Sequence, residues 1–464
     1  MTIPDWVQDA VFYQIFPDRF ANGDPGNDPP NVQPWGATPT IWGFQGGDLR
    51  GILYKLDYLL DLGVTALYLN PIFLAPSNHR YNISDYYRID PLLGTLDDFH
   101  VLLDALHRNG MRLILDGVFN HCGRGFFAFV DVLENEVHSP YKDWFHIRRF
   151  PLDAYGEGEA QNYAAWWNFK SLPKFNTDNP AVRRYLLDVA RHWIEQGIDG
   201  WRLDVPNEIN DDSFWAEFRQ VVKSANPQAY LVGEIWEPDP RWANETHFDG
   251  LMNYPFRAAL LDFLNGASDA LHFAETVEGL LRLYPRRNAY AMYLPLGSHD
   301  TERLFTALGG DLTKVKLAFL CQMAWIGAPA IYYGDEIGLE GGKDPDCRRA
   351  FPWDPADWKG DLRPWVQHLI ALRKRLPALR RGTHTRLLAE GPLYAFARIL
   401  GEERIVVIIN AGEEQRHIRL PVGDLWSDGR VPRNLLDHQA HPVREGRLEI
   451  SLPPRSGAWI GETA

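Results

Sequence analysis

Short apolar runs alternate with amphipathic segments along the first three-quarters of the chain. The apolar runs predict strands, and most of them end in polar or charged residues. We place these strands at residues 11–16, 66–69, 112–116, 229–234, 250–253, 289–294 and 330–333, with one more in the run that begins at Gly200. Helices are predicted at 49–63, 97–109, 180–196 and 212–225. This rhythm indicates parallel βα units.

The rhythm is interrupted once, and it changes near the end of the chain. Residues 122–178 are aromatic and irregular, which predicts a small inserted domain. After a helix at 365–375, short alternating runs at 393–398, 404–409, 417–420 and 448–452 predict an antiparallel β-sandwich.

The predicted fold is therefore α/β: a (β/α)8 TIM barrel with a small domain inserted after its third strand and a C-terminal β-sandwich. The predicted boundaries are 1–121 and 179–380 for the barrel, 122–178 for the insert and 381–464 for the last domain. A doubly wound open sheet is the competing fold, but no glycine-rich dinucleotide loop supports it.

Composition narrows the class of protein. The 464 residues are 45% apolar and 23% charged, which suits a globular chain with a large core. Their net charge of −14 disfavours nucleic acid or an anionic membrane as a partner. Three cysteines do not suggest a disulfide framework. The N-terminus has no basic segment followed by an apolar run, and no apolar run approaches about 18 residues, so we expect a cytoplasmic protein without a signal peptide.

Three carboxylates follow three different predicted strands: Asp204, Glu234 and Asp300. In a barrel they would meet at the C-terminal face. Arg202 lies two residues before Asp204 on the same face of its strand, so it can keep that carboxylate ionised, as a nucleophile requires. A structural ion pair is the other explanation of this spacing. Apolar neighbours around Glu234, with Trp236 after it, should raise its pKa, as a general acid requires.

Two histidines, His121 and His299, also lie at strand ends. They can donate hydrogen bonds to sugar hydroxyls. A zinc site is the rival use, but no third ligand at a recognisable spacing accompanies them.

A loop near the N-terminus gathers hard oxygen donors of the kind that calcium requires. The candidate ligands are Asn22, Asp24, Asn27 and Asp28. The competing explanation is that Asn, Asp, Gly and Pro simply form turns here. We expect a structural calcium ion at this loop.

Four segments resemble, in order and spacing, the strand-end motifs of the alpha-amylase family of retaining glycoside hydrolases. They are DGVFNH at 116–121, GWRLDVPNE at 200–208, GEIW at 233–236 and SHD at 298–300. The resemblance implies that Asp204 is the nucleophile, Glu234 the general acid/base and Asp300 the stabiliser of the transition state. It implies substrate contacts by Arg202, His121 and His299, and a bracing role for Asp116.

Further contacts are expected from Tyr81, Trp236 and Arg303. Tyr81 resembles the family's tyrosine that stacks beneath the cleaved sugar, although Asn82 stands where an Asp usually follows.

A second set of motifs resembles one branch of that family, the neopullulanase, cyclomaltodextrinase and maltogenic amylase group. These motifs are NPIF at 70–73, LPKFN at 172–176, DVPNE at 204–208 and GGKDPDCRR at 341–349. The N-terminal loop also resembles this group's calcium site, which implies that Asp48 and the carbonyl of Gly46 join Asn22, Asp24, Asn27 and Asp28 as ligands. Members usually carry an additional N-terminal β-domain, whereas here the barrel begins at Val11. We therefore expect that domain to be lacking and leave the oligomeric state and the preference for cyclodextrins open.

The resemblance implies a retaining α-glycosidase that hydrolyses α-1,4 bonds of maltooligosaccharides and starch-type glucans by double displacement through a glycosyl–Asp204 intermediate. Cyclodextrins and pullulan are further candidate substrates. A glucanotransferase or a trehalose-forming isomerase on the same scaffold is the alternative activity. A carbohydrate-binding relative without activity is a third hypothesis, which the presence of Arg202 and all three carboxylates disfavours.

Overall fold

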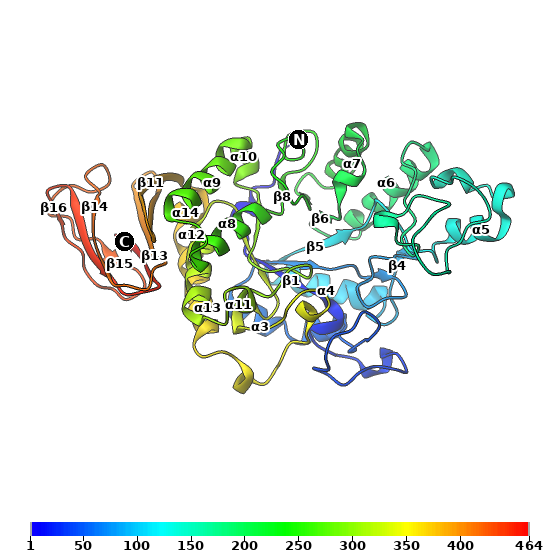
Figure 1. The fold of residues 1–464 in the computed structure, drawn as a ribbon, viewed down its shortest axis with the longest axis horizontal. Helices are drawn as coiled ribbons and strands as arrows, with labels where there is room; N and C mark the ends of the chain where they lie inside the picture. Colours follow the sequence, from blue (N-terminus) through cyan, green and yellow to red (C-terminus); the bar gives the residue numbers. More distant parts are fainter. Residues whose placement is uncertain (1, 463–464) are drawn as a thin grey trace.

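The computed structural model describes residues 2–462 and is built around one sheet of eight parallel strands (Figure 1). The order of the strands is β8-β7-β6-β5-β2-β1-β10-β9. A parallel bridge between Met252, next to β8, and Tyr293, in β9, joins the two edges, so the sheet closes into a barrel. The strands are β1 (Phe12–Ile15), β2 (Ala66–Leu69), β5 (Arg112–Gly117), β6 (Gly200–Leu203), β7 (Tyr230–Gly233), β8 (Gly250–Leu251), β9 (Tyr293–Pro295) and β10 (Ala328–Tyr332). The predicted barrel is confirmed.

Side-chain caps fix where several of the barrel helices begin. The Thr95 hydroxyl accepts a hydrogen bond from the Asp98 amide, and the Asp98 carboxylate accepts one from the Thr95 amide, a capping box that starts α4 (Leu96–Arg108). Asn179 caps α6 (Pro180–Glu195), and Asp211 caps α7 (Asp212–Ala225). The remaining α-helices outside the inserted segment are α1 (Trp6–Asp9), α2 (Leu49–Tyr54), α3 (Leu56–Leu62), α8 (Tyr254–Asn265), α9 (Ala270–Leu283), α10 (Arg286–Ala289), α11 (Leu304–Ala307), α12 (Leu312–Ala324), α13 (Leu362–Arg375) and α14 (Pro377–Arg381).

Several predicted bounds are shifted by a few residues, and two predicted elements differ more clearly from the structure. The helix expected at 49–63 is divided into α2 and α3 at Lys55. The seventh strand begins at Tyr293 rather than at Ala289, which ends the short helix α10. Residues 289–294 are all buried, so their apolar character did not mark where the helix ended and the strand began. Within residues 2–462, no helix combines the length and apolarity that a membrane span needs.

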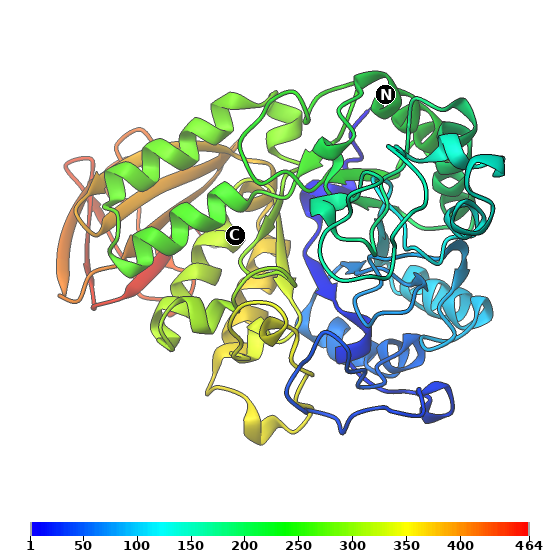
Figure 2. The same ribbon diagram turned by 45° about the vertical axis from the view of Figure 1, so that its right-hand side comes forward.

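The segment between β5 and α6 forms a lobe at one end of the molecule, opposite the C-terminal sheets (Figures 1 and 2). It contains α5 (Phe127–Asn135) and irregular loops, and an antiparallel bridge from His121 to Lys174 fastens it to the end of β5. A hairpin of β3 (Phe73–Leu74) and β4 (Asp85–Ile89) follows β2. Both insertions leave from C-terminal ends of barrel strands, where the active sites of such barrels lie.

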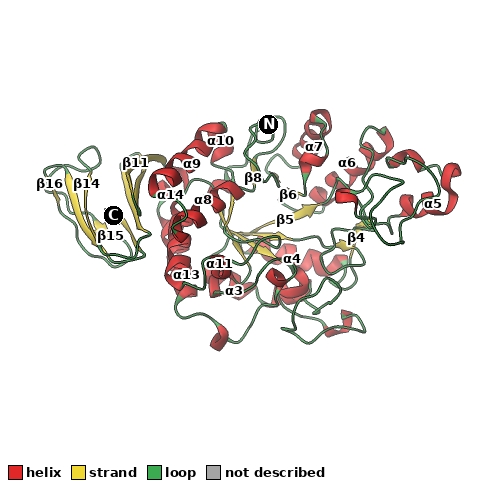
Figure 3. Cartoon of the chain, in the orientation of Figure 1, coloured by secondary structure: helices red, strands yellow, loops and turns green. Residues whose placement is uncertain are grey.

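The C-terminal part is a sandwich of two antiparallel sheets (Figure 3). The first has the order β11 (Thr383–Glu390), β12 (Leu393–Leu400), β13 (Glu403–Asn410), β18 (Ser456–Gly461) and β15 (Arg433–Asn434). The second has the order β14 (Arg416–Pro421), β17 (Arg447–Leu452) and β16 (Val443–Arg444). Alternate residues of β14 and β17 pack between the sheets, which confirms the predicted sandwich.

Candidate active site

The guanidinium of Arg202 is the centre of an ion cluster at the C-terminal ends of β5, β6 and β7. Its Nη1 atom lies 2.9 Å from Asp116 Oδ1 and 3.0 Å from Asp204 Oδ1, and its Nη2 atom lies 2.8 Å from Glu234 Oε1. The strand register explains the arrangement, because Asp116 on β5 pairs directly with Arg202 on β6. One buried cation therefore holds three carboxyl groups.

Burial perturbs the two carboxyl groups that were predicted to react. It raises the pKa of Glu234 to about 7, against the opposing effect of Arg202. The Glu234 Oε2 atom also accepts a hydrogen bond from the Val205 amide at 3.1 Å. Val205 has a φ of 35°, a strained conformation for a β-branched residue, so the backbone just after Asp204 is bent toward Glu234.

Two opposing effects act on the pKa of Asp204, the group that Arg202 is expected to keep ionised. Burial raises it well above its ordinary value; Arg202 opposes this shift, and the charges of Glu234 and Asp116 add to it. The guanidinium is shared among three carboxyl groups, which limits how far it can lower the pKa of Asp204. A proton on Glu234 removes one repelling charge, so the protonation of Glu234 favours the ionised form of Asp204.

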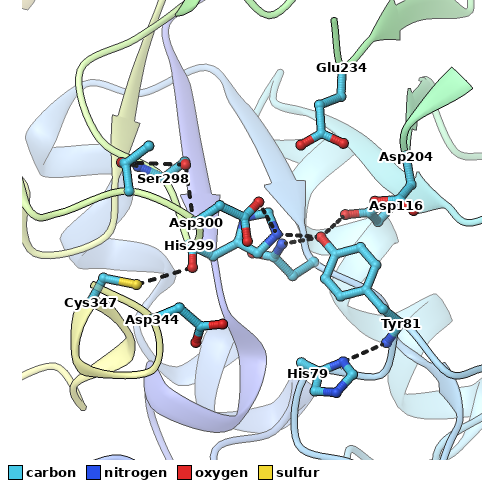
Figure 4. Close-up of polar contacts among 12 residues, drawn as sticks. His79, Tyr81, Asp116, Asp204, Glu234, Ser298, His299, Asp300, Asp344 and Cys347 are labelled. Carbon is cyan, nitrogen blue, oxygen red and sulfur yellow. Dashed lines mark hydrogen bonds and ion pairs between the residues drawn. The ribbon is translucent and has the colours of Figure 1, made fainter. Parts of the chain in front are cut away.

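Asp300 lies after β9 and faces the same space as Glu234 (Figure 4). Its Oδ2 atom is 3.1 Å from His299 Nε2, and its Oδ1 atom is 3.2 Å from Arg348 Nη2. Burial alone would raise the pKa of Asp300, but His299 and Arg348 outweigh it and hold the pKa below its ordinary value. The neighbours of Asp300 therefore favour its charged form.

Tyr81 and His299 form one wall of the site. Their rings are parallel, with centroids 5.3 Å apart, and the Tyr81 hydroxyl donates to Asp116 Oδ2 at 2.7 Å. The Gln14 amide nitrogen lies 2.9 Å from His299 Nδ1, which assigns the ring proton to Nε2, facing Asp300 and Tyr81. Burial lowers the pKa of His299 to about 3, so the ring is a neutral donor.

The other predicted substrate contacts divide into two groups. His121 is buried at the end of β5, and the half-exposed Trp236 stacks on Tyr254 with ring centroids 3.8 Å apart. Arg303, by contrast, does not reach the site. Its buried guanidinium donates to the carbonyls of Cys347 and Tyr333 and pairs with Asp335, so it braces the loop after β10.

Sequence reasoning missed Arg348 as a residue of the site. Besides Asp300, it contacts Asp344 through Nη1 at 3.0 Å and donates from Nε to the His299 carbonyl at 2.9 Å. The signal was present in the GGKDPDCRR run, but no strand end or periodicity marked which of its charged residues would turn toward Asp300.

The N-terminal loop brings most of its predicted calcium ligands together. The Asn22 amide nitrogen lies 2.9 and 3.0 Å from the two Asp28 carboxylate oxygens. A Cβ atom at Gly46 would lie 2.2 Å from Asp28 Oδ1, so only glycine lets the chain approach this closely. Asn27 Oδ1 is buried and has no hydrogen-bond partner in the part of the chain that the structure describes.

The remaining two predicted ligands have other partners. Asp48 caps α2 and accepts hydrogen bonds from backbone amides, and Asp24 pairs with Arg50. Among residues 2–462 no group of three or more His, Cys, Asp or Glu side chains could hold a metal, so a cation here would depend on amide and carbonyl oxygens beside the Asp28 carboxylate. The unpartnered Asn27 oxygen fits a hard cation. Asn22, Asn27, Asp28 and the Gly46 carbonyl would hold it as a structural ion, away from the reacting groups.

Comparisons with known proteins match the whole chain. Residues 14–369 match the family model "Alpha amylase, catalytic domain", and residues 384–459 match "Neopullulanase-like, C-terminal domain". A cyclomaltodextrinase from Geobacillus thermopakistaniensis is 48% identical over 97% of this chain and 76% of its own length.

Solved structures are similarly close. A cyclic alpha-maltosyl-(1→6)-maltose hydrolase from Arthrobacter globiformis, in complex with that sugar, superposes with a TM-score of 0.91 at 42% identity, covering 99% of this chain and 100% of its own. A debranching enzyme from Nostoc punctiforme gives the same TM-score, identity and coverage.

Proposed function

The chain belongs to the alpha-amylase family of glycoside hydrolases, and we propose that it hydrolyses α-1,4-glucosidic bonds in maltooligosaccharides, starch-type glucans and cyclodextrins with retention of configuration. The observation that carries the proposal is the cluster on Arg202, in which Asp204 and Glu234 are held by one cation and the pKa of Glu234 is about 7. At neutral pH this group can both give and take a proton.

In the first step the Glu234 carboxyl donates its proton to the glycosidic oxygen while Asp204 attacks the anomeric carbon. The carbon–oxygen bond to the leaving sugar breaks, and a covalent glycosyl–Asp204 ester forms. Positive charge develops on the sugar ring, where the charged Asp300 and the donor His299 face it.

In the second step the Glu234 carboxylate takes a proton from a water molecule, and the oxygen of that water attacks the anomeric carbon. The bond to Asp204 breaks, the carboxylate is regenerated, and Glu234 again holds a proton. Two inversions give net retention. This geometry requires the two carboxyl groups to be about 5–5.5 Å apart.

Cleavage of α-1,6 bonds is a second candidate activity. The Arthrobacter and Nostoc relatives are named for a cyclic α-1,6-linked sugar and for debranching, and they match this chain over 99% of its length. We infer that cyclic or branched maltosyl sugars are substrates as well.

The test compares initial rates and products on a cyclodextrin, soluble starch and pullulan, for the wild-type chain and Asp204→Asn. Hydrolysis that disappears in the variant is the expected result. Substantial turnover by Asp204→Asn would refute the mechanism. Transfer products that dominate when glucose is added as an acceptor would assign the chain to the glucanotransferases instead, and conversion of maltose to trehalose would make it an isomerase.

A further inference from the structure

Three stacked aromatic rings, those of His121, Trp166 and Trp167, lead outward from the active site into the inserted lobe. The His121 ring, buried at the end of β5, lies 5.6 Å from the Trp166 ring at an interplanar angle of 25°. Trp166 in turn stacks on Trp167, with centroids 4.7 Å apart and an angle of 7°. Trp166 is therefore covered by a ring on each side, and Trp167 is the outermost member.

The backbone that presents Trp167 is unusual. Trp167 has a φ of 47° and Asn168 a φ of 60°, so two successive residues lie in the left-handed region, which asparagine adopts readily and tryptophan rarely. Backbone hydrogen bonds hold the turn on both sides: the Trp166 amide donates to Leu172 O at 3.0 Å, and the Ala160 amide donates to Asn168 O at 2.8 Å. The conformation is thus imposed by the lobe.

The result of this strained turn is an exposed tryptophan. The Trp167 side chain is 71% exposed, whereas tryptophan side chains are highly buried on average. Packing does not explain both the strain and the exposure. Strain of this kind is characteristic of binding and catalytic positions, where the surrounding structure maintains it.

Two buried polar atoms of these stacked rings are also available to bind a ligand. Trp166 Nε1 and His121 Nε2 are buried and have no hydrogen-bond partner among residues 2–462. Burial lowers the pKa of His121 to about 3, so its ring is neutral. An indole N–H is a donor, and a neutral imidazole nitrogen donates or accepts, so both suit hydroxyl groups.

We propose that Trp167 is the platform for a glucosyl ring separated by at least two other units from the cleaved bond, beyond the reach of maltotriose, and that Trp166 Nε1 bonds a hydroxyl of the same glucan. The inference rests on the proposed function, and it adds a residue that determines chain-length preference. A sugar ring has an apolar face that can lie on the outer face of the Trp167 indole, while hydroxyls of the glucan reach the edges of the stacked rings.

Such a contact is made equally in the ground state and in the transition state, because Trp167 lies away from the reacting atoms. Its loss should therefore raise KM and leave kcat unchanged. The effect should appear only with substrates that are long enough to reach Trp167.

The experiment measures kcat and KM for Trp167→Ala and Trp167→Phe on maltotriose and on maltoheptaose. The control is Tyr54→Ala, which removes a 66% exposed aromatic ring at the C-terminal end of α2, outside the inserted lobe. For Trp167→Ala we expect KM to rise about tenfold on maltoheptaose, equivalent to about 1.4 kcal/mol, and less than about twofold on maltotriose. Trp167→Phe should recover most of the loss, and Tyr54→Ala should match the wild type.

Binding of maltoheptaose to Glu234→Gln, with and without Trp167→Ala, gives a second readout by calorimetry. An equal loss on both sugars, a fall in kcat alone, or unchanged binding would overturn the platform. A melting temperature that falls in both Trp167 variants, with equal losses on both sugars, would show a purely structural role. If the wild-type chain hydrolyses neither sugar, the proposed function fails, whereas a length-independent effect in an active enzyme refutes only the platform.

Discussion

The titration of Glu234 should set the alkaline limit of activity. Burial raises its pKa from 4.5 to about 7, and hydrolysis requires the protonated form. At pH 7 about half of the molecules then carry the proton, and at pH 8 about a tenth do. An unshifted carboxyl with a pKa of 4.5 would be protonated in about 0.3% of molecules at pH 7, so burial raises the competent fraction about 150-fold.

The contribution of this proton can be measured with Glu234→Gln on two substrates that differ in their leaving group. A sugar leaves as an alkoxide unless it is protonated, whereas fluoride leaves without a proton. Hydrolysis of maltotetraose by the variant should fall by a factor of about 10² to 10⁴, the usual contribution of a general acid. Release of fluoride from α-maltosyl fluoride should fall far less, because Asp204 still attacks.

The assay is kcat/KM between pH 5 and pH 9 for both substrates. Wild-type enzyme should show an alkaline limb with a midpoint near pH 7 on maltotetraose, and the control Glu237→Gln, an exposed carboxyl on the same loop, should show the same limb. Equal losses on both substrates in Glu234→Gln, or a wild-type midpoint near pH 5, would refute the assignment of the acid.

The raised pKa of Glu234 also affects the stability of the folded protein. Because the folded pKa of Glu234 lies above its ordinary value, the folded state binds this proton more tightly than the unfolded state. The cost of ionising Glu234 is absent below about pH 4.5, grows as the pH rises, and reaches about 3 kcal/mol above about pH 7. Replacing Glu234 by Gln removes this cost, so the stability of Glu234→Gln relative to wild type should rise by about 3 kcal/mol between about pH 4.5 and pH 7. The weakened contact with Arg202 should lower the stability of the variant by about 1–2 kcal/mol at every pH. Denaturant titrations at pH 5 and pH 8 measure the difference.

Three further predictions concern other parts of the molecule. Asp204→Asn should abolish turnover while maltooligosaccharide binding persists, which calorimetry checks. A chelator should lower the melting temperature if the N-terminal loop holds calcium, and an unchanged melting temperature would favour turns without a cation. Arg398→Met should cost about 3–5 kcal/mol of stability in calorimetry, because the buried guanidinium donates to the carbonyls of Ala324, Leu379 and Gly382 and its loss leaves buried acceptors between barrel and sandwich unpaired.

Most of the barrel was predictable because its strands are short apolar runs between polar ends. β2 and α7 have the predicted bounds, since turn residues or a side-chain cap mark where they begin or end. β11 was missed because the residues of Thr383–Glu390 are exposed or half-buried, so no apolar run marks the strand. Its pairing with β12 follows from the sheet rather than from its own pattern.

The candidate site was predictable where residues follow strands and not where they lie on long loops. Asp204, Glu234 and Asp300 are brought together by barrel geometry, which strand ends reveal. Arg348 and Trp167 belong to segments with no periodicity, and their approach to the site depends on how these loops fold back. For Arg303, a place just after a strand was misleading, since its side chain turns into the core.

In the proposed mechanism, Arg202 acts by pairing with three carboxyl groups, those of Asp116, Asp204 and Glu234, rather than with Asp204 alone. Asp116 accepts hydrogen bonds from Tyr68, Tyr81 and Arg202, so its charge balances that of the guanidinium. A proton on Glu234 leaves Asp204 to share the guanidinium with Asp116 alone, and the raised pKa of Asp204 reflects the cost of holding its charge in the buried site. In the proposed mechanism, the sugar ring gains positive charge next to this carboxylate as the glycosidic bond breaks. The attraction is therefore far stronger in the transition state than in the ground state, which is the condition for an interaction to accelerate the reaction rather than only to bind substrate.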